Sequence, residues 1–283
     1  MKKPLPILGA LVFTIFLAAC GNGQQPAPEA APPAESGAVV SEPTTVRIGI
    51  TAADDRHWQH VRNTLAEENI TLEIITFTDW VTPNTALAFG DIDLNAFQTH
   101  TFLANFNEEN NENLVAIGET TIMPMGIYSV RHTSLDDIGE GFTISIADDP
   151  TNGARALLVL QSAGLIEVDP AAGYLAMISD ITYNPLNLNF IALVAQQLPI
   201  ALPDVDFAVI NAVIALEANL HPHTDSIFLE PITDDGSPFN NLIAARAERA
   251  NEPALQAVVR HFQTNEVADI IHDIFDNTQF PVW

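Results

Sequence analysis

Residues 142–164 read FTISIADDPTNGARALLVLQSAG. The apolar run at 142–147 predicts a buried β-strand, and 151–163 predicts a helix that ends at Gly164. Such a strand–helix unit is typical of sheets that are covered by helices on both faces. Because the same alternation continues along the rest of the chain, this unit indicates an α/β fold.

The alternation predicts strands and helices on both sides of the unit. We expect further strands at 46–50, 71–77, 93–97, 114–117, 188–194, 207–210 and 242–246. We expect further helices at 57–68, 83–89, 98–107, 253–264 and 266–275, with Thr82 as the N-cap of the second helix, Pro83 at its first position and Gly90 past its end. Two such blocks predict two lobes. Lobe 1 is expected to contain 46–127 plus 228–283, and lobe 2 to contain 128–227.

The first twenty residues have the layout of a secretory signal. Lys2 and Lys3 precede an apolar stretch at 5–19, which is short for a membrane span. Leu17-Ala-Ala-Cys20-Gly21 resembles a bacterial lipobox, which predicts a signal peptide at 1–19 and acylation of Cys20; the alternative is a plain signal peptide with an incidental cysteine. Cys20 is the single cysteine, so its acylation would leave no thiol for a disulfide or a nucleophile.

The segment that follows and the overall charge limit the partners we expect. Residues 20–45 are rich in Pro, Ala, Glu and Gln, which predicts a disordered tether. The formal charge is −26, and both lysines lie in the predicted signal. A surface with 36 acidic residues disfavours nucleic acid and anionic lipid as partners.

The strongest candidate site lies between strand 142–147 and helix 151–163. In α/β folds of this kind, ligands bind beyond the carboxyl ends of the strands, where helix N-termini favour anions. Asn152 can add a side-chain donor, and Arg155 can bind a carboxylate with two hydrogen bonds. Equally, Arg155 can pair with Asp148 or Asp149, and the local pattern does not decide between these interpretations.

Other candidates supply an aromatic wall and two amides. Trp80, Phe97 and Phe102 suit an apolar or thioether side chain, although core packing also explains them. Asn211 follows strand 207–210, and Asn184 precedes a proline; either can accept a hydrogen bond from an ammonium group or satisfy local backbone.

The other motifs give weaker indications. His57 and His60, or His221 and His223, form pairs that lack the supporting ligands of known metal sites, so we expect no metal and no cofactor. For His57 we expect instead a position in the cleft at the start of a helix. The chain contains no nucleophile elbow, P-loop or dinucleotide-binding glycine motif, which argues against an enzyme.

Several longer segments resemble one family in the same order along the chain. They are FTDWVTPN (77–84), GDIDLNAFQ (90–98), DPTN (149–152) with Arg155, QLP (197–199), AVIN (208–211) and NLI (241–243). Residues 46–283 are similar to the methionine-binding lipoproteins of the NlpA/MetQ type.

The resemblance implies a two-lobed periplasmic-binding-protein fold, type II-like, with two crossovers between the lobes and the ligand in the cleft between them. It also implies that the protein captures methionine for the permease and ATPase of an ABC importer, as a lipid-anchored protein of the cell membrane that faces the periplasm or the cell exterior. By position, Asn152 and Arg155 would hold the ligand carboxylate and Asn211, with Asn184 nearby, its amino group. The aromatic residues would surround its side chain.

The chain departs from the family pattern in the side-chain pocket. The family has tyrosine where this chain has Trp80 and Phe102, and histidine where it has Thr99. D-Methionine, a methionine-containing dipeptide, another apolar amino acid and a non-transport interaction role therefore stay open as alternatives.

Overall fold

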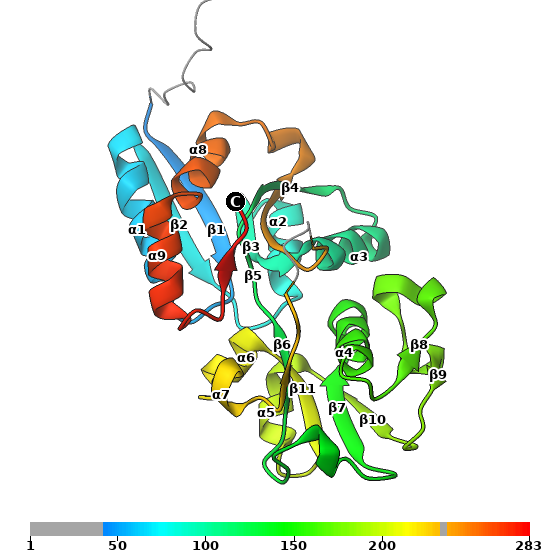
Figure 1. Ribbon diagram of the computed structural model, residues 1–283. Helices are drawn as coiled ribbons and strands as arrows, with labels where there is room; N and C mark the ends of the chain where they lie inside the picture. Colours follow the sequence, from blue (N-terminus) through cyan, green and yellow to red (C-terminus); the bar gives the residue numbers. More distant parts are fainter. Residues whose placement is uncertain (1–41, 233–236) are drawn as a thin grey trace, which may run out of the picture. The chain divides into compact units, whose positions relative to one another are not determined.

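The computed structural model describes residues 42–232 and 237–283. These residues form two five-stranded sheets, and each sheet has helices on both faces (Figure 1). We call each sheet with its helices a lobe. The α/β class and the two-lobed fold are confirmed.

Lobe 1 has the strand order β2-β1-β3-β13-β4. Its strands are β1 (Thr44–Ile50), β2 (Ile70–Thr76), β3 (Leu94–Thr99), β4 (Leu114–Glu119) and β13 (Asn241–Arg246). Strand β1 is parallel to β2 and β3, whereas β13 is antiparallel to β3 and β4. The late strand β13 therefore completes a sheet that the first part of the chain began.

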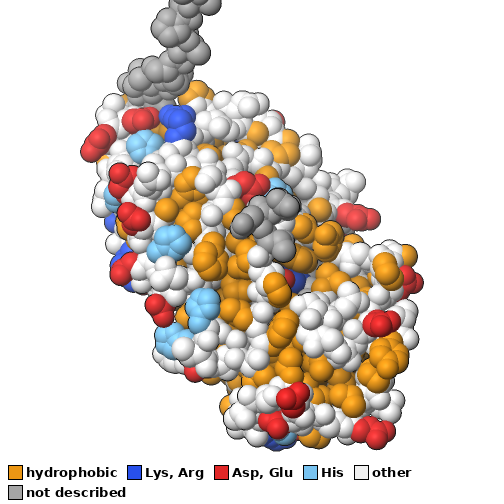
Figure 2. Space-filling view, in the orientation of Figure 1, with side chains coloured by type: hydrophobic (Ala, Val, Ile, Leu, Met, Phe, Trp, Pro, Cys, Tyr) orange, Lys and Arg blue, Asp and Glu red, His pale blue; other side chains and the backbone are white. Residues whose placement is uncertain are grey.

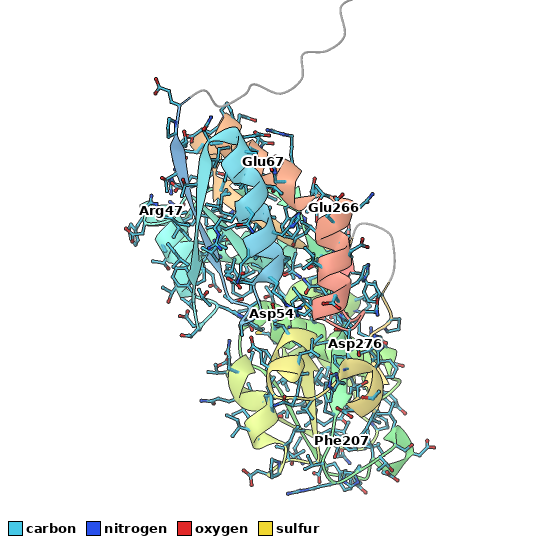
Figure 3. The ribbon with its side chains drawn as sticks, turned by 90° about the vertical axis from the view of Figure 1, so that its left-hand side faces the viewer. Arg47, Asp54, Glu67, Phe207, Glu266 and Asp276 are labelled. Carbon is cyan, nitrogen blue, oxygen red and sulfur yellow. The ribbon has the colours of Figure 1, made fainter. Side chains whose placement is uncertain are left out.

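Helices cover the two faces of this sheet in separate groups. The helices are α1 (Arg56–Leu65), α2 (Thr82–Phe89), α3 (His100–Asn110), α8 (Pro253–Phe262) and α9 (Asn265–Ile274). Side chains alternate along β13, so Ile243 packs in the core beneath α1, α8 and α9, and Leu242 packs beneath α2 and α3. Figure 3 shows α1 and α9 side by side, with Glu67 and Glu266 on this outer surface.

Lobe 2 has the strand order β10-β7-β11-β6-β12. Its strands are β6 (Met125–Tyr128), β7 (Thr143–Ala147), β10 (Asn189–Leu193), β11 (Phe207–Asn211) and β12 (Phe228–Leu229). Its helices are α4 (Pro150–Ser162), α5 (Leu198–Ala201), α6 (Ala212–Glu217) and α7 (Pro222–Asp225), and a small ribbon pairs β8 (Glu167–Val168) with β9 (Ile181–Tyr183). Along β11, Phe207 and Val209 pack under α4, while Ala208 and Ile210 pack under α5 and α6.

The chain passes between the lobes twice. The first crossing runs from β5 (Thr121–Ile122), which pairs with β14 (Phe280–Pro281), into β6, and the second runs from β12 to β13. Sequence analysis expected the boundaries at 127/128 and 227/228. Because β6 and β12 both pair within the lobe 2 sheet, we propose that the first boundary lies near Pro124 and the second after Leu229.

Most expected elements lie within a few residues of the observed ones, but several elements and one helix start differ. Strands β6 and β12 and helices α5, α6 and α7 of lobe 2 were not predicted, and neither were the short pairs β5–β14 and β8–β9. Thr82 is the first residue of α2 and not its N-cap; the Asp79 carboxylate accepts hydrogen bonds from the backbone N–H groups of Val81 (2.8 Å) and Thr82 (2.7 Å) instead. Gly90 ends α2 with φ at +82°, as expected of a C-terminal glycine.

The predicted signal peptide, Cys20 and the tether up to residue 41 lie outside the described residues, and the last tether residues, Thr44 and Thr45, belong to β1. None of the described helices combines the length and apolar character that a membrane span requires.

Candidate ligand-binding site

A pocket lies between the lobes, at the carboxyl ends of β1 and β3 on one side and of β7 and β11 on the other. Its volume is about 970 Å³, which includes the open solvent at its mouth. The first crossing contributes Thr121, Met123 and Pro124 to its wall. The lining includes Thr51, His57, Trp58, Trp80, Phe97, Gln98, Thr99, Phe102, Thr121, Met123, Asn152, Arg155, Asn211, Asn241, Phe262, Phe275 and Gln279.

Arg155 projects from the second turn of α4 into this pocket and is 5% exposed. Its Nε lies 3.1 Å from both carboxylate oxygens of Glu230, and its Nη2 lies 2.6 Å from Glu230 Oε2 and 2.7 Å from the carbonyl oxygen of Met123. Within 42–232 and 237–283, Nη1 has no hydrogen-bond partner. One edge of the guanidinium is therefore fixed by both crossings, and the Nη1 edge can bind a ligand carboxylate.

An aromatic side chain covers the face of the same guanidinium. The ring centroid of Phe239 lies 4.5 Å from Arg155 Cζ, and Phe239 meets Tyr174 edge-to-face at 5.4 Å. Its neighbours are held to lobe 1, because the carbonyl oxygens of Pro238 and Asn240 accept hydrogen bonds from Thr101 and His100. Arg155 is thus held by ion pairing along one edge and by an aromatic ring over its face.

A chain of amides extends from the start of α4 to the end of β11. Asp149 accepts hydrogen bonds from the Asn152 backbone (2.9 Å) and from Asn152 Nδ2 (3.0 Å), and Asn152 Oδ1 accepts one from Asn211 Nδ2 (2.7 Å). Asn211 Oδ1 is buried and has no partner among the described residues. Since a buried acceptor without a donor is costly, Asn211 is poised to accept a hydrogen bond from a ligand.

The wall of the pocket in lobe 1 is aromatic. Phe97 and Phe102 meet edge-to-face with ring centroids 5.8 Å apart. Trp80, which follows β2, also lines the pocket and packs against the lobe 2 core that contains Ile214. Thr99 Oγ1 accepts a hydrogen bond from the Phe102 backbone (3.2 Å) at the N-terminus of α3, so this hydroxyl fixes the helix start.

Buried amides behind this wall hold it in place. Asn84 and Gln98 are joined by two hydrogen bonds of 2.7 Å, and Asn95 Nδ2 donates to Asn84 Oδ1 at 2.8 Å. All three side chains are almost fully buried, and they satisfy one another. The network connects α2 to β3, the strand that carries Phe97.

This chain is similar to known proteins over nearly its whole length. The model of the family described as NlpA lipoprotein matches residues 46–283. The D-methionine-binding lipoprotein MetQ of Salmonella typhimurium is 33% identical, over 99% of this chain and 98% of the relative. This chain belongs to the NlpA lipoprotein family. The family comprises solute-binding lipoproteins and is not an enzyme family, in agreement with the sequence analysis.

Solved structures of NlpA relatives share the fold. A nutrient-binding protein of Burkholderia cenocepacia bound to methionine has a TM-score of 0.80 at 37% identity, covering 84% of this chain and 100% of that one. The substrate-binding protein of a methionine transporter from Streptococcus pneumoniae has a TM-score of 0.79 at 35% identity, covering 84% of this chain and 96% of that one.

Seven of the eight predicted ligand-binding residues line the pocket of this NlpA lipoprotein; the exception is Asn184. Its amide forms hydrogen bonds of 2.9 and 3.0 Å with the backbone of Leu188, so it stabilises a turn in lobe 2. Asn152 also differs from expectation, because its hydrogen bonds go to Asp149 and Asn211; it orients Asn211 from within the lining.

Sequence analysis missed Glu230 and Phe239, and the alternative pairing of Arg155 with Asp148 or Asp149 is wrong, because Glu230 takes that place. A buried arginine requires a carboxylate, but the sequence offers no way to choose among 36 acidic residues. Among residues 42–232 and 237–283, no three His, Cys, Asp or Glu side chains gather into a metal-binding group.

His57 begins α1 in the cleft, as expected, and gives the fold a pH dependence. It packs against Trp58, Phe262 and Phe275, and burial lowers its pKa to about 4, against opposing contributions from Asp54 and Asp55. The unfolded chain therefore binds more protons than the native protein between pH 6.5 and 4. The contribution of neutral, buried His57 to the stability of the native state is therefore complete above pH 6.5 and is lost as the pH falls toward 4.

As the pH falls from 7 to 5, we expect His57 to lower the free energy of unfolding by about 2 kcal/mol. Urea unfolding of ligand-free protein at pH 7, 6 and 5 measures this loss. His57→Gln should lose that much less stability over the same range. His60→Gln, one turn further along α1 and partly exposed, is the matched control and should follow the wild type. Parallel pH profiles for His57→Gln and wild type would contradict the assignment. Asp54, one of the two acids that oppose the lowering of the His57 pKa, lies at the end of α1 nearest lobe 2 (Figure 3).

Proposed function

We propose that this protein is the solute-binding lipoprotein of an ABC importer and that it captures methionine or a closely related amino acid. One observation carries the proposal: a single pocket presents the Nη1 edge of Arg155 and Oδ1 of Asn211, neither of which has a partner among residues 42–232 and 237–283. The first suits an α-carboxylate and the second an α-ammonium group, which together define an amino acid.

The rest of the pocket specifies the side chain of that amino acid. Trp80, Phe97 and Phe102 line it, together with Trp58, Phe262 and Phe275 of the lobe 1 core. Aromatic rings stabilise apolar groups by burial and thioether sulfur by contacts at the ring edge. Relatives named for D-methionine binding, and one solved with methionine bound, support this ligand.

The proposal includes delivery to a membrane. We infer that Cys20 carries the lipid anchor, that the protein faces the periplasm or the cell exterior, and that it delivers its ligand to a permease and its ATPase. The match to the substrate-binding protein of a methionine transporter supports this context. The strongly acidic composition supports a partner surface other than nucleic acid.

Calorimetric titration of ligand-free protein with the twenty L-amino acids, D-methionine and methionine-containing dipeptides tests the ligand. We expect saturable binding of one methionine per chain and weaker binding of leucine, which lacks the sulfur. A tighter fit to another apolar amino acid or to a dipeptide would replace methionine and keep the class. If no amino acid and no short peptide binds, the proposed function is wrong.

A further inference from the structure

The ligand-binding arginine has its counter-charge in place before any ligand arrives. The Arg155 and Glu230 side chains are 6% and 15% exposed, and their closest N–O distance is 2.6 Å. The Glu230 carboxylate accepts a further hydrogen bond from the Met125 backbone at 2.8 Å, and the Glu230 backbone N–H donates to the Met125 carbonyl oxygen at 2.8 Å. Glu230 is therefore fixed to the start of β6 independently of Arg155.

The charged groups around the Arg155 guanidinium therefore have a net charge of zero or below before a ligand binds. Arg155 contributes +1 and Glu230 contributes −1, and Asp149, which is linked to Asn211 through Asn152, adds a further negative charge. A simple carboxylate that binds the Nη1 edge brings an uncompensated negative charge into a buried space, where charges interact strongly. A zwitterionic amino acid brings a positive charge as well, and Asn211 Oδ1 is an unpaired acceptor for it.

We propose that Glu230 is a specificity-determining residue that makes the pocket select zwitterionic amino acids over simple carboxylic acids. Because Glu230 offsets the charge of Arg155, the N–H groups of Nη1 remain available as hydrogen-bond donors, but the site has little net attraction for anions. The inference rests on the proposed function, because it requires the ligand carboxylate to bind Arg155. Glu230 itself has its carboxylate on the far edge of the guanidinium and acts through Arg155.

The test compares methionine with 4-(methylsulfanyl)butanoate, which is methionine without its amino group. Calorimetry gives the ratio of the two dissociation constants for wild type, Glu230→Gln and Glu217→Gln. Glu217, which is exposed at the end of α6, borders the cleft beside Trp80 and makes no ion pair with any described residue, so it is the control for loss of one negative charge. In wild type, we expect 4-(methylsulfanyl)butanoate to have a much higher dissociation constant than methionine. Glu230→Gln should reduce the ratio of the two constants at least tenfold, because the anion then binds more tightly. Glu217→Gln should keep the wild-type ratio.

The outcomes separate this inference from the proposed function. If wild type binds neither methionine nor any other amino acid, the proposed function fails. If wild type binds methionine but Glu230→Gln narrows the ratio by less than tenfold, or Glu217→Gln narrows it equally, the role of Glu230 is overturned. Equal binding of both ligands by wild type overturns it without any variant. Glu230→Met, of similar length and without charge, replaces the glutamine variant if that variant does not fold.

Discussion

Replacing Arg155 by Ala is expected to abolish tight methionine binding. Arg155 is the buried cation that lines the pocket, and its Nη1 edge has no protein partner among residues 42–232 and 237–283. Removing one partner of a desolvated charge pair costs about 2–5 kcal/mol. The dissociation constant should therefore rise roughly 30- to 5,000-fold, which calorimetry measures directly.

A loss of binding in Arg155→Ala has a second possible cause that a matched variant removes. The single substitution leaves the Glu230 carboxylate buried and unpaired, which destabilises the native state. The double variant Arg155→Met/Glu230→Gln removes both charges and keeps a similar volume, so the protein should unfold near the wild-type urea concentration. It should still fail to bind methionine. A folded double variant that binds methionine with wild-type affinity would show that Arg155 does not hold the carboxylate.

The fold could be predicted from local patterns because its strands and helices are defined by their own residues. The segment 142–164 forms β7 and α4 as expected, with Gly164 at φ +78° after the helix. Strand 242–246 was expected in lobe 1, but its antiparallel position between β3 and β4 could not be predicted, because it depends on pairing across more than a hundred residues.

The candidate site likewise contains residues that could be predicted from the sequence and residues that could not. Residues near the carboxyl ends of strands, such as Asn211 in β11 and Phe97 in β3, could be found because strand ends converge at such sites. Glu230 and Phe239 lie in the second crossing, where no periodic pattern marks them. Asn184 has the same amide as Asn211, and only the structure shows that its hydrogen bonds close a turn.

The surface gives a further contrast between composition and structure. On the face that Figure 2 shows, the acidic side chains are scattered and lie mostly around the edges, while hydrophobic side chains gather over lobe 2. Large apolar side chains exposed in that lobe include Tyr174, Met177, Tyr183 and Ile200. Net charge alone therefore does not describe the surface that a partner would meet.

Replacing Asn84 by Ala is expected to destabilise lobe 1 by about 3–4 kcal/mol. Asn84 is fully buried and makes three of the amide hydrogen bonds that connect α2 to β3. Its loss leaves Gln98 Oε1 buried without its donor, and it opens a small cavity. Urea unfolding of the ligand-free protein at pH 7 measures the change as a lower midpoint with an unchanged slope.

The size of this effect depends on burial and not on helix propensity, and a matched pair of variants separates the two. Alanine is a better helix former than asparagine, so propensity alone predicts that Asn84→Ala stabilises α2. Asn110→Ala, at the exposed end of α3, loses one local hydrogen bond to Phe106 and should change stability by less than about 1 kcal/mol. If Asn84→Ala is as stable as Asn110→Ala, the buried network does not stabilise the wall. If it is destabilised as expected, the hydrogen bonds that place Gln98 at the pocket and Phe97 beside it also stabilise the lobe, so binding geometry and folding depend on the same three amides.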